Sequence, residues 1–269
     1  MTRTVFFVVA LFLMICTQKE VQGQRKPVDK KANQTLRVLT YNIHHANPPS
    51  KPGLIDLDAI ARVIIDSKAD VVALQEVENG ANRTGKTDQA KLLGEKTGLH
   101  YQFFKAIDFD GGEYGIAVLS RYKLSDIKLV PLPQQVTDEK RVLGYATIKV
   151  GKQDIILANT HLDARRTDEN RVVQMERILK EFENTALPVI LCGDLNAVAG
   201  TEVINLLDGQ FKRTCTENCG FTIPEVTPTH TIDFIAGKNL KWPVLEHKVI
   251  DEPYASDHRP VIAVFKTGK

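Results

Sequence analysis

The segments Cys192-Gly193-Asp194-Leu195-Asn196-Ala197 and Ser256-Asp257-His258-Arg259-Pro260 are the most informative parts of this chain. The first follows a short apolar run and the second precedes one, so each lies at the end of an expected β-strand. A rigid sheet can hold polar groups at its strand ends and direct them into a cleft. Two residues apart on extended backbone, Asp194 and Asn196 would point to one face. An aspartate beside a histidine offers a metal ligand next to a proton-transfer group, which favours hydrolytic chemistry on phosphate.

The N-terminal residues have the pattern of a secretory signal peptide. Arg3 supplies a positive charge, residues 5–15 form an unbroken apolar run, and residues 21–23 offer a small-residue cleavage site. The run is short for a membrane span and lacks a stop-transfer flank, although an uncleaved N-terminal anchor is the alternative. We therefore expect cleavage near Gly23 and export of the protein to the periplasm or the extracellular space.

Composition predicts one ordinary folded domain. The chain has 269 residues, of which 43% are hydrophobic and 25% charged, enough to bury one substantial core. Residues 24–35 are polar, basic and aperiodic, which indicates a linker, and residues 36–269 continue without a second composition regime. The net charge is +2, and it falls to +1 when Arg3, Lys19 and Glu20 leave with the signal peptide. This balance gives no strong field for steering a polyanion, and we expect a monomer without a stable protein partner.

The cysteines outside the signal peptide suggest two different environments. Cys192 lies in an apolar strand and is expected to be a small buried hydrophobic residue. Cys215 and Cys219 flank a short turn, and an exported protein can oxidise them to a disulfide. Metal binding by this pair is the weaker alternative, because no further Cys or His pair nearby completes a zinc site.

Apolar periodicity predicts many strands and few helices. Helices are expected over residues 57–67, 87–98, 169–183 and around 201–207. Strands are expected over residues 36–41, 71–74, 101–105, 115–120, 142–150, 154–160, 189–191, 232–236 and 261–265. Consecutive hairpins in the middle of the chain argue against a doubly wound parallel sheet. Two packed sheets, each covered outside by helices, fit this order better.

Several of these strands end in side chains that suit metal binding. Glu76 follows the strand over residues 71–74, and a lone glutamate suits Mg²⁺ better than Zn²⁺. Asn42 follows the first strand, where a turn is the common alternative, and we expect His44 and His45 to be loop residues. Tyr114 precedes the strand over residues 115–120, where it either packs over glycine backbone or faces a phosphate.

Two further strands carry groups for proton transfer. His161 and Asp163 follow a strand and should share one side of the backbone, although a structural histidine is the alternative. Asp233 lies within an apolar strand, where an unpaired carboxylate is costly, so it needs a partner. We expect that partner to be His258, which the carboxylate would orient and make more basic.

Together, these motifs resemble the endonuclease/exonuclease/phosphatase superfamily, in the order that the family has, from about residue 36 to residue 265. The motifs that carry the resemblance are Tyr41-Asn42, Leu74-Gln75-Glu76-Val77, Tyr114-Gly115-Ile116-Ala117-Val118-Leu119-Ser120-Arg121, Asn159-Thr160-His161-Leu162-Asp163, Gly193-Asp194-Leu195-Asn196, Ile232-Asp233-Phe234-Ile235 and Ser256-Asp257-His258-Arg259-Pro260. The resemblance implies an α+β fold, a four-layer α/β/β/α sandwich of two mainly antiparallel sheets. It also implies a divalent cation, usually Mg²⁺, with Mn²⁺ or Ca²⁺ as alternatives.

The resemblance assigns the expected metal ligands and the groups around the attacking water. Glu76 would be the principal metal ligand, and Asn42 and Asp257 would complete the site. Asp194 and Asn196 would position the water and the phosphate.

It also assigns the groups that face the substrate. Asp233 would orient His258, and either His258 or Asp194 would be the general base. His161 would be a second imidazole on the phosphate. Tyr114 would contact the phosphate, and Arg141 would bind substrate.

The expected function is that of an exported Mg²⁺-dependent phosphodiesterase, most simply of the nuclease type, acting by in-line attack on phosphorus. A nuclease requires a basic groove beside the cleft, which residues 165–171 could supply. The alternatives are a phospholipid or sphingomyelin phosphodiesterase and a phosphatase, although Trp242 stands alone and no aromatic hairpin is evident. A catalytically silent binding module is a further alternative. A zinc hydrolase is the remaining one, but the sequence lacks the clustered histidine ligands that such an enzyme needs.

Overall fold

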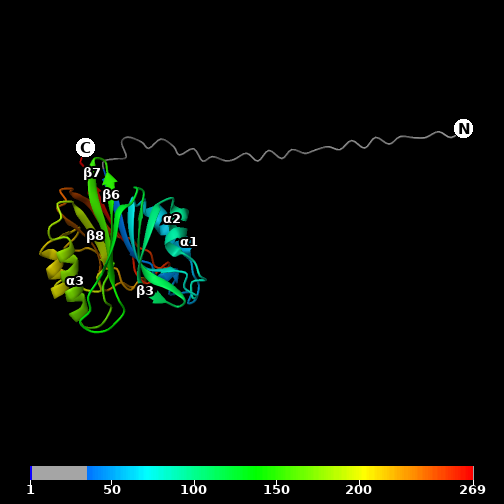
Figure 1. Ribbon diagram of the computed structural model, residues 1–269, viewed down its shortest axis with the longest axis horizontal. Coiled ribbons are helices and arrows are strands. Elements are labelled where there is room, and N and C mark those ends of the chain that lie inside the picture. Colours follow the sequence, from blue (N-terminus) through cyan, green and yellow to red (C-terminus); the bar gives the residue numbers. More distant parts are fainter. Residues whose placement is uncertain (2–34, 269) are drawn as a thin grey trace. The chain divides into compact units, whose positions relative to one another are not determined.

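Two six-stranded sheets form the centre of the fold in the computed structural model, which describes Met1 and residues 35–268 (Figure 1). The predicted signal peptide and linker lie outside the described residues, apart from Met1 and Thr35. The first sheet contains, in spatial order, β11 (Val244–Val249), β12 (Val261–Lys266), β1 (Thr35–Asn42), β2 (Val71–Asn79), β4 (Gly112–Ser120) and β3 (His100–Phe109). The second contains β5 (Ser125–Pro131), β6 (Val142–Val150), β7 (Gln153–His161), β8 (Val189–Asp194), β10 (Asp233–Lys238) and β9 (Lys212–Arg213).

Both sheets are mainly antiparallel, as predicted. In the first sheet only β1 and β2 pair in parallel, and in the second only β7 and β8 do so, among the strands that the structure describes. Each parallel pair therefore lies inside its sheet with antiparallel neighbours on both sides. The strand ends of these central pairs carry the polar residues of the motifs.

Helices cover the outer face of each sheet. They are α1 (Leu57–Ser67), α2 (Gln89–Thr97), α3 (Glu169–Glu181) and α4 (Glu202–Asp208), and a short 3₁₀ turn spans His44–Ala46. Side-chain caps begin the first two, since Asp56 accepts from the Ala59 amide and Asp88 from the Lys91 amide. Gly98 ends α2 at a φ of 70°, a left-handed position that glycine tolerates. No helix among the described residues is long and apolar enough to cross a membrane.

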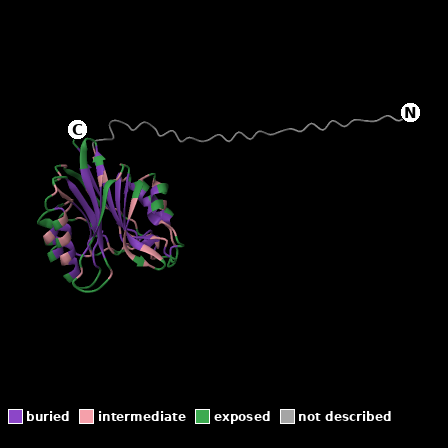
Figure 2. Ribbon diagram, viewed as in Figure 1, coloured by how far each residue is buried: buried purple, intermediate pink, exposed green. Residues whose placement is uncertain are grey.

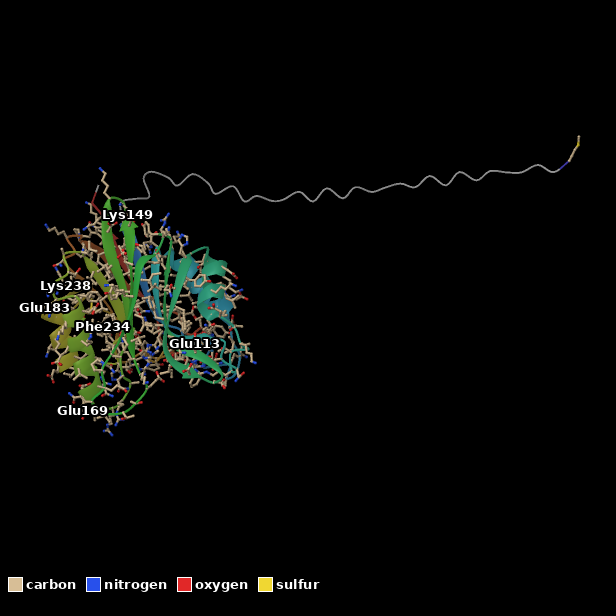
Figure 3. The ribbon with its side chains drawn as sticks, viewed as in Figure 1. Glu113, Lys149, Glu169, Glu183, Phe234 and Lys238 are labelled. Atoms are coloured by element: carbon tan, nitrogen blue, oxygen red, sulfur yellow. A yellow bond between two sulfur atoms is a disulfide. The ribbon has the colours of Figure 1, made fainter. Side chains whose placement is uncertain are left out.

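Three apolar layers hold the sandwich together. One lies between the two sheets, one between α1, α2 and the first sheet, and one between α3, α4 and the second sheet. In Figure 2 the strands are accordingly buried, while the helices are exposed on their outer surfaces. The labelled charged side chains Lys149, Glu169, Glu183 and Lys238 lie at the periphery in Figure 3. The predicted four-layer α/β/β/α sandwich is confirmed.

A buried polar contact also joins the two sheets. Gln75 Nε2 of β2 donates to Asn159 Oδ1 of β7 at 2.7 Å. Asn159 Nδ2 in turn donates to the carbonyls of Leu74 and Ala117, both at 2.8 Å. Because these groups are fully buried, their hydrogen bonds restrict how the sheets lie against each other.

Three strands were not predicted from the sequence: β5, β11 and the two-residue strand β9. β5 and β11 lie at sheet edges, and most of their residues are exposed or half-buried. Their sequences therefore mix charged and apolar residues without a clean alternation. Several predicted strands are also longer than expected: β2 continues to Asn79, β3 to Phe109 and β8 to Asp194, and β4 begins at Gly112.

Candidate active site

One amide group joins the two sheets at the candidate site. Asn42 ends β1 in the first sheet, and Asp194 ends β8 in the second. Asn42 Nδ2 donates to Asp194 Oδ2 at 3.1 Å and to Glu76 Oε1 at 3.0 Å. The fully buried Asn42 side chain thus holds two carboxylates from different sheets, rather than forming a simple turn.

The sequence suggested that Glu76 ends its strand. In the structure it lies on a β-bulge within β2. The pairing of β2 with β4 shifts register between Gln75 and Val77, and Glu76 has a φ of 56°. A bulge adds one residue to one strand and re-aims its side chain without ending the pairing. The apolar run 71–74 therefore predicted the strand correctly but not its length.

His45 approaches Glu76, although the sequence suggested only a loop residue. His44, His45 and Ala46 all have positive φ, which side chains other than glycine adopt rarely. This turn places His45 Nδ1 at 3.9 Å from Glu76 Oε2. Burial alone would raise the pKa of Glu76, but His45, His161 and the Asn42 amide outweigh burial and lower it. Glu76 is therefore an ionised carboxylate at neutral pH.

Two imidazoles converge on Asp194. His161 Nε2 lies 3.5 Å and His258 Nε2 3.7 Å from Asp194 Oδ2. The predicted partnership of Asp233 and His258 is present: Nδ1 lies 2.9 Å from Asp233 Oδ2. Asp233 also stands directly opposite Asp194 in the pairing of β8 with β10. The structure therefore places both carboxylates and both imidazoles at one end of the second sheet.

Burial gives these groups unequal charges. It raises the pKa of Asp194, with the Asp233 carboxylate adding to the effect. Burial would lower the pKa of His258, but the carboxylates of Asp233 and Asp194 outweigh it and raise that pKa to about 10. His161 shows the opposite result, because burial and the Arg141 charge lower its pKa. At neutral pH, His258 is cationic and His161 is neutral.

Arg141 fixes the tautomer of His161. Its Nη1 lies 3.1 Å from His161 Nδ1, and a guanidinium can only donate. Nδ1 is therefore the acceptor, and the ring proton lies on Nε2, which faces Asp194. Glu139, which the sequence analysis missed, lies 2.8 Å from the same Nη1 and partly balances the charge of Arg141. No motif marks Glu139, since it lies in a polar loop.

Tyr114 lies within β4, not before it as predicted, because the strand begins at Gly112. Its ring is buried, and its centroid lies 5.9 Å from that of the Phe109 ring, so Tyr114 packs against an aromatic side chain. Burial, followed by the Glu76 charge, raises the pKa of Tyr114, while Arg141 opposes the rise. The Tyr114 hydroxyl is therefore neutral and close enough to Glu76 and Arg141 for their charges to affect its pKa.

Three predicted residues are placed differently or less directly. Asn196 has a φ of 47°, so the expected extended backbone is wrong; its amide N–H donates to Asp194, and its side chain donates to the Leu162 carbonyl. Asp163 lies beyond β7, which ends at His161, and its carboxylate accepts a hydrogen bond from Asn170 at the start of α3. Asp257 is half-buried beside His258.

The available donors suit a hard divalent cation. Glu76 is ionised and, with Asp257 and Asn42, offers only oxygen ligands. Asn42 Oδ1 accepts one hydrogen bond, from the His44 amide, and an amide oxygen has a second lone pair. Oxygen donors suit Mg²⁺, whereas Zn²⁺ prefers sulfur and nitrogen. Donor atoms of a neighbouring buried group, Asp194, Asp233 and His258, also lie within 4.8 Å of one another.

This four-layer sandwich, with buried carboxylates, imidazoles and an arginine gathered at one end, is the fold of a family of phosphoester hydrolases. The model of the Endonuclease/Exonuclease/phosphatase family matches residues 39–258, so the chain belongs to that family. Members of the family are generally hydrolases of phosphoester bonds and typically depend on a divalent metal. A search of curated protein sequences gives no match.

Solved structures support the same fold. An endonuclease/exonuclease/phosphatase from Beutenbergia cavernae is 24% identical with a TM-score of 0.71, covering 87% of this chain and 72% of its own. The human Nocturnin catalytic domain with bound sulfate is 22% identical with a TM-score of 0.69, covering 87% and 94%. The mannosyl-6-phosphatase Bt3783 of Bacteroides thetaiotaomicron is 18% identical with a TM-score of 0.66, covering 85% and 98%.

Proposed function

We propose that the protein is an exported, Mg²⁺-dependent phosphodiesterase of the nuclease type. The observation that carries the proposal is the Asn42 amide, which brings the Glu76 side of the site against the Asp194 and His258 side. An oxygen ligand set, a cationic imidazole and a basic carboxylate then surround one position that a phosphate can occupy. Export is supported by the disulfide between Cys215 and Cys219, a bond that persists in oxidising compartments.

The residues divide the chemistry between them. Glu76, Asn42 and Asp257 would hold the cation, which when bound neutralises charge on the phosphate oxygens. His258 is already protonated, so it holds the phosphate by its charge and Asp233 fixes its ring. Asp194, whose pKa is raised, accepts the proton of the attacking water.

A phosphatase is the second candidate, and Arg141 favours it. A phosphomonoester carries more negative charge than a diester, and the Arg141 guanidinium beside His161 supplies an additional buried cation. One structural neighbour is a mannosyl-6-phosphatase, which is consistent with this alternative.

Two chromogenic esters test the proposal and separate these candidates. Purified protein is assayed with Mg²⁺ on bis-p-nitrophenyl phosphate and on p-nitrophenyl phosphate, and again after chelation. We expect metal-dependent hydrolysis with a higher kcat/KM on the diester; the reverse preference would favour a phosphatase. Plasmid DNA and sphingomyelin then distinguish a nuclease from a lipid phosphodiesterase.

Matched histidine variants show whether the site carries the activity. His258→Ala should abolish hydrolysis, whereas His100→Ala, which changes an exposed histidine on β3, should leave it unchanged. Full activity of His258→Ala, or of the chelated wild type, would refute the proposal. N-terminal sequencing of secreted protein tests export, with Gln24 as the expected first residue.

A further inference from the structure

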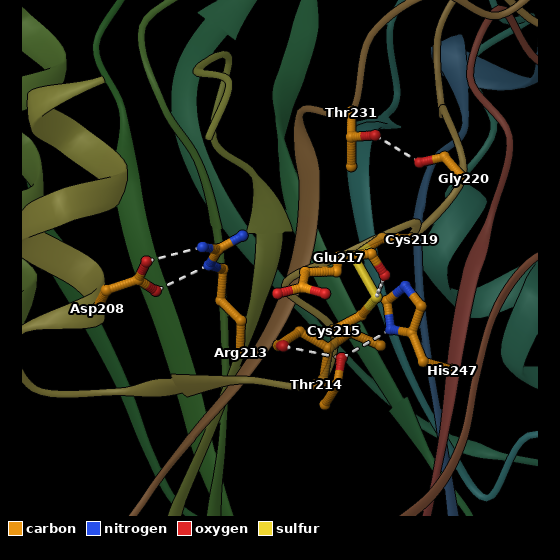
Figure 4. The surroundings of a disulfide bond; sticks show 10 residues. Asp208, Arg213, Thr214, Cys215, Glu217, Cys219, Gly220, Thr231 and His247 are labelled. Atoms are coloured by element: carbon orange, nitrogen blue, oxygen red, sulfur yellow. Dashed lines mark hydrogen bonds and ion pairs between the residues drawn. A yellow bond between two sulfur atoms is a disulfide. The ribbon is translucent and has the colours of Figure 1, made fainter. Parts of the chain in front are cut away.

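A cavity of about 480 Å³ borders the catalytic cluster at Asp233. Its walls come from the start of β10, from the loop that follows β9, and from β11, where His247 faces the Cys215–Cys219 disulfide (Figure 4). Ala199, three residues after Asn196, also lines the cavity. Asp233 belongs both to this wall and to the pair with His258, so the cavity shares one carboxylate with the catalytic cluster.

Covalent and hydrogen bonds hold the wall in place. The disulfide closes the short loop from Cys215 to Cys219. The Thr214 hydroxyl bonds His247 Nδ1 at 2.8 Å and the Ile235 carbonyl at 3.1 Å. The Thr231 hydroxyl donates to the Gly220 carbonyl, as Figure 4 shows. The cavity is therefore formed before any ligand arrives, which reduces the entropic cost of binding.

The cavity combines apolar walls with one unsatisfied acceptor. Phe234 and Ile235 are buried in its wall, the disulfide adds an apolar surface, and Phe221 also lines it with 54% of its surface exposed. Asp233 is 1% exposed, and its Oδ1 has no hydrogen-bond partner among residues 35–268. A buried carboxylate oxygen without a donor is costly, so a ligand that donates to it gains affinity.

These features favour a flat heterocycle over the other groups that phosphate esters carry. A sugar would need many polar partners, and these walls are mainly apolar. An acyl chain would leave the Asp233 oxygen without a donor. A nucleobase has apolar faces that can stack on Phe221 and N–H donors at its edge.

We propose that this cavity binds the base of the nucleotide whose phosphate lies at the catalytic cluster. The inference rests on the proposed nuclease-type function and names the part of the substrate that the enzyme recognises. The His247 ring lies beside the two cysteines, which are bonded to each other.

Two esters with the same leaving group provide the test. Thymidine 5′-(p-nitrophenyl phosphate) and methyl p-nitrophenyl phosphate both release p-nitrophenolate, and only the first carries a base. Phe221→Ala should lower kcat/KM for the thymidine ester about 10-fold, the scale of losing one stacked base, and change the methyl ester less than about twofold. Ala199→Phe, which fills the cavity, should act in the same direction.

The control is Ile127→Ala, since Ile127 is a comparably exposed apolar residue on β5. In the second sheet, β5 forms the edge opposite β9. It should change neither ester. Equal losses on both esters, or no loss on the thymidine ester, would overturn the proposal. Thermal unfolding of each variant shows that a selective loss is not a folding defect, because a folding defect would affect both esters.

Direct binding separates the failure of this inference from the failure of the proposed function. If the wild type hydrolyses neither ester, the nuclease proposal fails while the base site is still measurable. Calorimetry should show that thymidine 5′-phosphate binds the wild type about 10-fold more tightly than glycerol phosphate, and that Phe221→Ala removes the difference. Equal affinities for the two phosphates would show that the cavity does not bind a base.

Discussion

The two sheets contribute opposite kinds of carboxylate to one site. Glu76, on the first sheet, has its pKa lowered by imidazole and amide neighbours and stays ionised. Asp194, on the second sheet, is more deeply buried, faces the charge of Asp233, and has its pKa raised. In the proposed function, the same functional group would serve as a cation ligand in one place and as a proton acceptor in the other, because its surroundings differ.

The largest effect is expected on the second sheet. Asp233→Asn removes the charge that raises the pKa of His258 and holds its ring, so kcat should fall about 10²- to 10⁴-fold. Rates on bis-p-nitrophenyl phosphate across a Mg²⁺ titration measure this loss. The Mg²⁺ concentration for half-maximal activity should not change. A rise in this Mg²⁺ concentration would contradict the assignment of cation binding to the first sheet and proton transfer to the second.

The complementary change on the first sheet is Glu76→Gln. The neutral amide keeps the shape of the side chain but loses the charge that attracts the cation. We expect the Mg²⁺ concentration for half-maximal activity to rise about 10- to 100-fold. The matched variant Glu113→Gln changes a half-buried glutamate on β4 and should leave the Mg²⁺ requirement unaltered. An unchanged requirement in Glu76→Gln would remove it from the ligand set.

The buried contact between the sheets should matter for stability. Asn159→Ala removes the side-chain hydrogen bonds to the carbonyls of Leu74 and Ala117, and it leaves the Gln75 amide nitrogen with Thr40 Oγ1 as its remaining partner among the described residues. The free energy of unfolding should fall by about 3 kcal/mol. Urea unfolding measures it, with the exposed Asn184→Ala as the control. A loss as small as that of the control would mean that the network does not hold the sheets together.

The smallest effect is expected at the disulfide, which closes a short loop between β9 and β10. The Cys215–Cys219 loop is short, so reduction by a dithiol should cost about 2 kcal/mol of unfolding free energy. The Mg²⁺ requirement should not move, because no predicted ligand belongs to this loop. A shift in that requirement on reduction would contradict the separation of the two regions.

Parts of the fold and of the site could be predicted from the sequence because they depend on local residue spacing or on the energetic cost of burying a charge. The apolar spacing of residues 57–67 predicts α1 at its observed bounds. The cost of burying an unpaired carboxylate predicts that Asp233 needs a histidine, and His258 is there. The motif order also identifies the family that the comparisons confirm.

The remaining features depend on single backbone angles or on distant chain segments. Nothing in the spacing of residues 71–79 marks the left-handed φ of Glu76, and nothing marks the turn that brings His45 to it. The prediction that Asp194 and Asn196 point to one face assumed extended backbone, and it was wrong because Asn196 has a left-handed φ. His247 lies near the cysteines only because β11 pairs with β12 and reaches the loop after β9.

The bridging amide of Asn42 has a consequence for how activity is lost. One nitrogen donates to a carboxylate in each half of the sandwich, so a small slip between the halves would pull cation and proton acceptor apart. The catalyst is complete only when both halves have docked in register. As the denaturant concentration rises, activity should therefore be lost before either half unfolds. Turnover should report the docking of the two halves more sensitively than any spectroscopic measure of strand content.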